Sequence, residues 1–222
     1  MQAIESQNLI LYHTDLRGQW PQESARACAA RLPYARRLAL GSGSVAARAS
    51  LAGIALALRA LSRGLGRRVL LSEILFTQGE KPRLAPPVAL AVGETRVAEP
   101  AVARPDDGTA AADFSISHAG PWVACAALAH GRVGLDLEMG TDERIADWVL
   151  REALLKASGA GMRALREVRA LTVREDRVCW RGALWQVRRL EGYDGASACL
   201  VSSRQVPAVE SSAVALAELF GT

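Results

Sequence analysis

The order of helix-like and strand-like segments constrains the fold of this chain more than any single motif does. Residues 42–66 predict a long helix with a cap at Ser42 or Ser44 and glycines at its end. Residues 141–161 predict a second helix, with acids in its first turn and glycines at its end. Several short strand-like segments follow each helix, so the order predicts a duplicated α+β unit.

Three short strands are predicted in the middle of the chain, and their flanks are less regular. The three are residues 114–118 (FSISH), 122–128 (WVACAAL) and 133–138 (VGLDLE), and the linker AHGR between the last two has hairpin length. Further strands are predicted over 88–97 and, as a meander, over 170–203, with a short terminal helix over 211–220. Residues 68–78 fit either a strand or the end of a helical pair.

Composition indicates a globular protein with a sizeable core, because half of its 222 residues are hydrophobic. No uninterrupted run reaches the ~18 apolar residues of a membrane span, and residues 1–15 do not resemble a secretory signal. We therefore expect a cytoplasmic protein without a membrane partner. The four cysteines have no metal-binding spacing and are expected to be reduced: Cys28, Cys125, Cys179 and Cys199.

The net charge of +4 comes almost wholly from arginine, since only Lys81 and Lys156 are lysines among the 27 basic residues. The arginines are dispersed and form no recognisable reading motif, so nucleic acid is not expected as a partner. Each lysine is either a chance survivor or a position that needs a compact, mobile charge.

The segment VGLDLE can be a metal-binding strand. Alternation places Val133, Leu135 and Leu137 on one side and directs Asp136 and Glu138 to the other. Two neighbouring carboxylates repel each other unless a cation lies between them, and oxygen ligands suit Mg²⁺ or Mn²⁺. The alternative is a solvated face of an edge strand.

The second helix carries a stripe of residues at intervals of four, Trp148, Glu152 and Lys156. The Glu152–Lys156 pair is either a surface ion pair or a third carboxylate and a cation for the same site. Three acids beside a lysine predict a site for phosphate transfer.

His118, which follows Ser115 and Ser117, is either a hydrogen-bonded residue of the strand end or a donor to an anion. Serine hydrolase chemistry is excluded because the chain has no GxSxG elbow. Phosphate contact through Ser117 and His118 is the functional interpretation.

Four ordered segments resemble the motifs of the 4′-phosphopantetheinyl transferases, specifically the surfactin-type subfamily. They are GEKPRL, FSISHAGPWVACA, VGLDLE and WVLREALLKASGAG, within residues 79–161. The resemblance implies a pseudo-dimer of two similar halves, about 1–131 and 132–222, each a long helix packed on a small, mainly antiparallel sheet. It further implies a monomer that binds coenzyme A between the halves and transfers its phosphopantetheine arm to a serine of an acyl or peptidyl carrier protein.

The resemblance also implies roles for individual residues. Asp136, Glu138 and Glu152 would hold Mg²⁺ against the pyrophosphate of coenzyme A. Glu152 would be the base for the incoming serine, and Lys156 would bind the pyrophosphate and neutralise the leaving 3′,5′-ADP.

Five further residues would contact the nucleotide if the resemblance holds. They are Lys81 with Pro82, Ser117 with His118, and Arg48 at the 3′-phosphate.

The chain departs from this family between its acids, because Glu138 and Glu152 are only 14 residues apart. The missing segment contacts the carrier protein in relatives. Arg151 and Val149 replace a lysine and a threonine of the family's helix motif. Two other functions stay open: a metal-dependent phosphate-ester hydrolase, and an inactive module that binds a carrier protein.

Overall fold

The computed structural model describes residues 9–33, 44–77, 80–86, 111–206 and 208–220, and these form a mixed α+β fold. The first four-stranded sheet has the order β10 (Val209–Ala213), β1 (Leu9–Asp15), β5 (Trp122–Leu128) and β4 (Asp113–Ala119). The second has the order β6 (Val133–Met139), β9 (Ala196–Ser202), β8 (Ala183–Leu190) and β7 (Arg177–Trp180). All neighbouring pairs in these two sheets are antiparallel except β1 and β10.

Shorter elements surround the two sheets. A two-stranded antiparallel sheet joins β2 (Ile74–Leu75) to β3 (Arg83–Leu84). The α-helices are α1 (Gln22–Ala30), α3 (Val45–Leu65), α4 (Glu143–Ser158) and α5 (Leu165–Arg169). The 3₁₀ turns are η1 (Leu71–Glu73), η2 (Met162–Ala164) and η3 (Leu216–Glu218).

The two predicted long helices are confirmed, and their caps explain where they begin and end. The Ser44 hydroxyl accepts a hydrogen bond from the Ala47 amide at the start of α3, and Gly66 ends it with a φ of 61°. The Asp142 carboxylate caps α4 in the same way, and Gly159 ends this helix with a φ of 71°.

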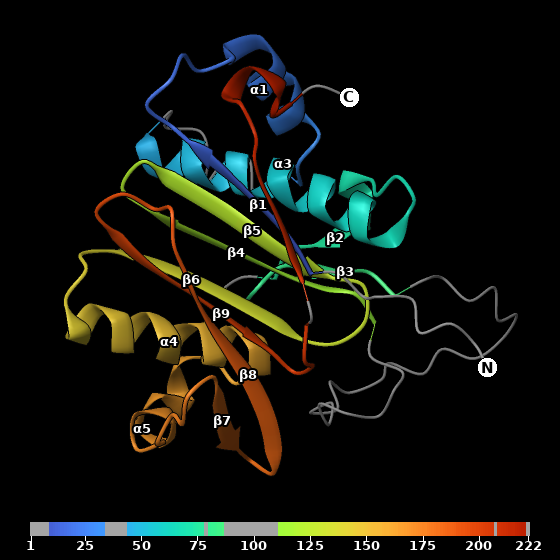
Figure 1. Ribbon diagram of the computed structural model, residues 1–222. Helices are drawn as coiled ribbons and strands as arrows, with labels where there is room; N and C mark the ends of the chain where they lie inside the picture. The colour runs from blue at the N-terminus through green and yellow to red at the C-terminus, as the bar shows by residue number, and fades with distance from the viewer. Residues whose placement is uncertain (1–8, 34–43, 78–79, 87–110, 207, 221–222) are drawn as a thin grey trace, which may run out of the picture.

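The molecule is layered in the order α3, first sheet, second sheet, α4 (Figure 1). α3 covers one face of the first sheet, and α4 covers the outer face of the second. A third set of buried side chains lies between the sheets and includes Leu9, Leu135 and Leu137. By length and composition α3 is apolar enough to cross a membrane. Most of its apolar side chains are buried against the first sheet.

Several sequence-based predictions about the strands are corrected. The three central strands exist, but β5 and β6 do not form the predicted hairpin, because Gly131, with a φ of 122°, leads the chain into the other sheet. The predicted terminal helix over 211–220 is wrong: its first part belongs to β10, and only Leu216–Glu218 is helical. Residues 170–176 form no strand. The predicted strand over 88–97 lies outside the described residues.

The region predicted as either strand or helix, 68–78, contains η1 and β2. β10, from the expected second half, pairs with β1 in the sheet of the expected first half.

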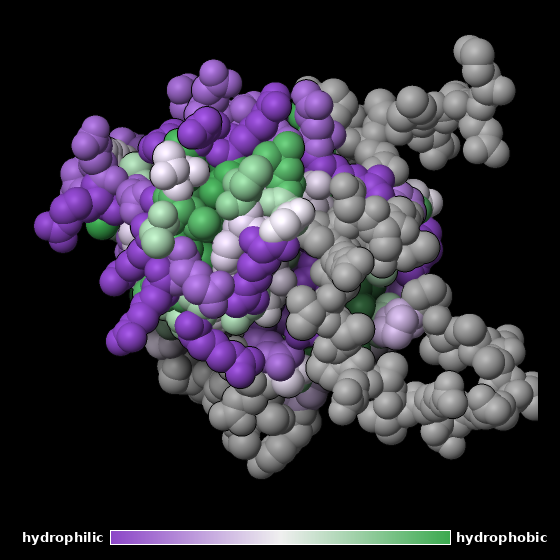
Figure 2. Space-filling model, turned by 90° about the horizontal axis from the view of Figure 1, so that it is seen from below, coloured by the Kyte–Doolittle hydropathy of each residue, from purple (hydrophilic) through white to green (hydrophobic). Residues whose placement is uncertain are grey.

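The face of the molecule on the side of α5 and β7 is largely hydrophilic around an apolar area (Figure 2).

Candidate functional site

The two sheets meet where three side chains of β4 reach the main chain of β6. Asp113, Ser115 and Ser117 lie on one side of β4 because they alternate along it. Their oxygens accept hydrogen bonds from the amides of Val133, Leu135 and Leu137, at 2.8, 3.0 and 3.1 Å. β6 is an edge strand, so these side chains satisfy amides that a further strand would otherwise bind.

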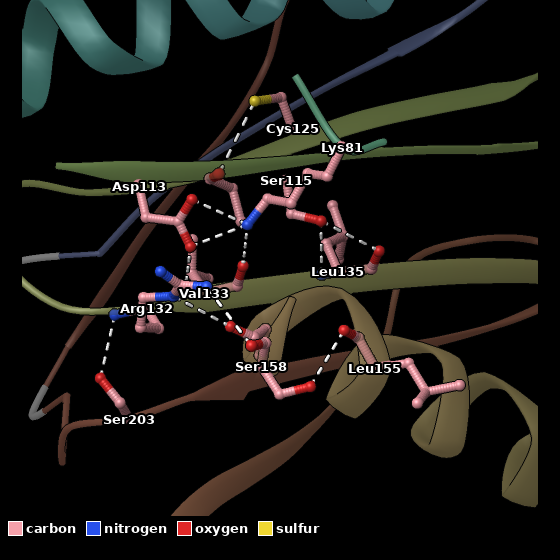
Figure 3. Close-up of polar contacts among 12 residues, drawn as sticks. Lys81, Asp113, Ser115, Cys125, Arg132, Val133, Leu135, Leu155, Ser158 and Ser203 are labelled. Carbon is pink, nitrogen blue, oxygen red and sulfur yellow. Dashed lines mark hydrogen bonds and ion pairs between the residues drawn. The ribbon is translucent and has the colours of Figure 1, made fainter. Parts of the chain in front are cut away.

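We call this contact between the β4 side chains and the β6 main chain the seam. Lys81 lies at one end of it (Figure 3). Its Nζ lies 2.7 and 2.8 Å from the two carboxylate oxygens of Asp113 and 2.6 Å from the Val133 carbonyl oxygen. Burial lowers the pKa of Lys81, and the negative charge of Asp113 opposes this effect. The three donor hydrogens of this ammonium group therefore already have partners within the protein.

Asp136 and Lys156 form an ion pair at the other end of the seam. Asp136 is 3% exposed, and its Oδ1 lies 2.5 Å from Lys156 Nζ and accepts a hydrogen bond of 2.9 Å from the Ser117 hydroxyl. Burial raises the pKa of Asp136, and Lys156 counteracts the rise. The Lys156 charge is thus held beside a carboxylate that the protein has largely removed from water.

The other two predicted acids lie near this pair but are less enclosed. Glu152 Oε1 is 3.6 Å from Lys156 Nζ, and the Glu138 side chain is exposed. Within the part of the chain that the structure describes, no three His, Cys, Asp or Glu side chains are close enough together to hold a metal ion. The Oδ2 atom of Asp136 is nevertheless buried and has no hydrogen-bond partner there, and such an atom fits a cation.

A cavity of about 640 Å³ lies beside the seam and along α4. Its lining includes Lys81, Pro82, Glu152 and Lys156, four of the residues predicted to bind coenzyme A or take part in catalysis. Its wall contains five basic and three acidic side chains, so the net formal charge of the lining is positive. Its volume suits a small organic molecule.

Three other predicted nucleotide contacts, Arg48, Ser117 and His118, do not line this cavity. The Ser117 hydroxyl is instead bonded to Asp136 and lies 3.4 Å from Lys156 Nζ. The Arg48 guanidinium lies 5.7 Å from the centre of the Trp20 ring, at the start of α3. His118 is exposed near the end of β4, where it alternates with Ser117 and therefore points to the opposite side of the strand. Arg48 and His118 are therefore not part of the cavity wall that contains Lys81 and Lys156.

Arg151, which stands where the resemblance would place a lysine, joins two elements of the fold. It is 8% exposed, and its Nη1 donates to the carbonyl oxygens of Val168 and Leu171 at 2.6 and 2.8 Å. Its Nε and Nη2 donate to Asp147 one turn earlier. Arg151 thus joins α4 to the end of α5 and does not reach the cavity lining.

Sequence reasoning missed five polar residues of the seam and cavity: Asp113, Glu80, Arg83, Arg132 and Arg163. Asp113 had a usable signal, because it continues the alternation of Ser115 and Ser117 by one step. The three arginines come from loops, turns and a two-residue strand, where periodicity gives no information about neighbours.

No protein-family model matches the sequence, and neither does any curated protein. The geometry of the site combines a cavity of net positive charge with Lys156, which buried Asp136 orients, and with Glu152 one helical turn before Lys156. Such a site is suited to binding and transferring a phosphorylated group.

Proposed function

We propose that the protein is a Mg²⁺-dependent 4′-phosphopantetheinyl transferase, which transfers the arm of coenzyme A to a serine of an acyl or peptidyl carrier protein. The observation that carries this proposal is the contact of Lys156 with buried Asp136 at the wall of the 640 Å³ cavity. Pyrophosphate chemistry needs charge neutralisation and positioning more than covalent help. A cation fixed at one position of a cavity provides both.

The chemistry follows from the positions of two side chains of α4. The serine oxygen attacks the phosphorus that carries the pantetheine arm, and the bond from this phosphorus to the oxygen of 3′,5′-ADP breaks. Glu152, which lines the cavity, accepts the serine proton directly or through water. Lys156 binds the pyrophosphate and neutralises the charge on the leaving oxygen.

Asp136, Glu138 and Glu152 would hold Mg²⁺ in this proposal. The buried Oδ2 of Asp136, which lacks a partner in the described structure, supports the first of these assignments. When bound, the metal ion supplies further positive charge to the pyrophosphate oxygens. Mn²⁺ has the same preference for oxygen ligands.

Support for two similar halves comes from strand order. β1, α3, β4 and β5 follow one another in the first half, as β6, α4, β8 and β9 do in the second. In each sheet the last of these strands pairs with both others, giving the orders β1-β5-β4 and β6-β9-β8. The proposal places coenzyme A between these halves.

The short connection from Glu138 to Glu152 holds only the end of β6, a turn and the first part of α4. We infer that the acceptor protein contacts these elements directly, without the extra segment of the family. The proposed setting is a cytoplasmic monomer with coenzyme A and the carrier as partners.

The test is the intact mass of an apo carrier protein after incubation with the chain, coenzyme A and Mg²⁺. A gain of one phosphopantetheine arm supports the transferase, and a carrier with its acceptor serine changed to alanine is the matched control. Release of nucleotide without this gain would support the hydrolase. Absence of both reactions, together with carrier binding, would support the inactive module.

A further inference from the structure

Among the residues that the structure describes, Arg163 is the basic residue of the cavity for which no hydrogen bond or ion pair is found. It is exposed, it belongs to η2, and it makes no hydrogen bond or ion pair with any residue that the structure describes. The other four basic side chains of the lining have partners. Lys81, Lys156 and Arg83 form ion pairs with Asp113, Asp136 and Glu80, respectively. Arg132 donates hydrogen bonds to main-chain carbonyls of α4. An incoming anion can therefore bind Arg163 without breaking a contact to any described residue.

The part of the cavity between Lys156 and Arg163 runs along the end of α4. β6 and α4 run in opposite directions, since Asp136 contacts Lys156 while Arg132 contacts the carbonyls of Ala157 and Ser158. The cavity thus continues beyond Lys156 towards the end of the helix. A ligand with its pyrophosphate at Lys156 has room to extend towards Arg163.

Two glycines keep this path open. Gly159 and Gly161 have φ angles of 71° and 67°, and residues 159–163 all line the cavity. A Cβ atom at Gly161 would meet no atom of the described residues within 4 Å, so this part of the lining borders space that those residues leave open. Arg132 donates to the carbonyls at the end of α4, which offsets the negative end of the helix dipole next to an anionic ligand.

Arg48, the residue expected from the sequence to contact the 3′-phosphate, lies elsewhere. Arg48 stacks on Trp20, and neither it nor His118 lines the cavity. The 3′-phosphate of a ligand in this cavity therefore needs another cation.

We propose that Arg163 binds the 3′-phosphate of coenzyme A and makes the protein discriminate between coenzyme A and dephospho-coenzyme A. This inference rests on the proposed function, because it assumes that the ligand is this nucleotide. Arginine matches a phosphomonoester well, since its guanidinium group offers parallel donors to two phosphate oxygens. Dephospho-coenzyme A lacks that phosphate and would not use Arg163.

The test measures the binding of both nucleotides to the full chain by isothermal titration calorimetry. The wild type is expected to bind coenzyme A more tightly than dephospho-coenzyme A, by about 10- to 100-fold. Arg163→Ala should remove this preference by weakening only the binding of coenzyme A. The matched control is Arg166→Ala, which removes an exposed arginine of α5 that does not line the cavity and should leave both affinities unchanged.

Each outcome is decisive, and activity is not needed to read it. Equal binding of the two nucleotides by the wild type, or no binding of either, overturns the proposal. So does a preference that survives Arg163→Ala, or one that Arg48→Ala or His118→Ala abolishes instead. A wild type that shows the expected preference but modifies no carrier protein would retain this site and overturn only the proposed transfer.

Discussion

At the scale of single residues, the ion pair of Asp136 and Lys156 was predictable in part. The spacings that place Asp136 two residues before Glu138, and Glu152 four before Lys156, are local and follow directly from strand and helix geometry. The partner of Asp136 was not predictable, because it depends on how α4 crosses β6.

Asp136→Ala and Glu152→Ala are each expected to lower phosphopantetheine transfer at least ~100-fold, because each removes charge that the reaction uses. The measurement is the initial rate of carrier modification by mass spectrometry, with circular dichroism to verify folding. Glu167→Ala is the control, since this exposed glutamate pairs with Arg181 and neither residue lines the cavity. Full activity in either of the first two variants would contradict the site.

His13 gives a prediction for pH dependence. Its ring lies edge-on to Trp122 and Tyr193, and its buried Nδ1 has no partner in the described structure. Burial lowers the pKa of His13 in the folded protein below its ordinary 6.5. At a pH between the folded and the unfolded pKa, the unfolded chain therefore binds a proton at His13 that the folded protein does not. Stability should therefore fall as the pH drops through 6.5.

The variant His13→Phe keeps an aromatic ring and removes this titration. We expect the free energy of unfolding to vary less with pH between about 5 and 7.5 in the variant than in the wild type. Urea denaturation at several pH values measures the difference. Parallel pH profiles for the two proteins would show that His13 does not have the proposed linkage.

At the scale of elements, close packing of β6 on α4 fixes the geometry of the site. A Cβ atom at Gly134 would lie 1.9 Å from the Ala153 carbonyl oxygen and 2.5 Å from the Ala157 amide nitrogen. Only glycine allows this approach, which brings Asp136 within reach of Lys156.

Gly134→Ala is therefore expected to destabilise the protein by about 3 kcal/mol, because main-chain atoms of the helix must move. Gly64→Ala, within α3, is the control: its Cβ would lie at an ordinary 3.7 Å from Ile10, and alanine favours a helix. Thermal and urea unfolding measure both changes. Equal stabilities of the two variants would contradict the close contact.

The elements themselves were easier to predict than their pairing. Serine, aspartate and glycine caps define α3 and α4, and apolar runs define β4 and β5. Whether two neighbouring strands share a sheet depends on contacts far apart in the sequence. This is why the predicted hairpin of β5 and β6 was wrong, although both strands exist.

At the scale of the whole molecule, the cavity was beyond prediction from spacing. Its basic residues come from β3, from the turn before β6, from α4 and from η2, and only folding brings these segments together. Four of the predicted ligand or catalytic residues line it, and five do not: Arg48, Ser117, His118, Asp136 and Glu138.

We expect a monomer in solution, because both sheets and both long helices belong to one chain and bury each other. Sedimentation equilibrium should give a mass near the 23.6 kDa of the chain at all loading concentrations. A mass that rises towards twice this value with concentration would show self-association instead.

The parallel pairing of β1 with β10 also affects synthesis. β10 lies far behind β1 in the sequence, so the ribosome makes it long after β1, and this edge of β1 has no β10 to pair with until then. Unpaired strand edges are templates for aggregation. Prematurely terminated chains should therefore be much less soluble than the finished protein, and chaperones that shield nascent strands should raise the yield of the finished protein.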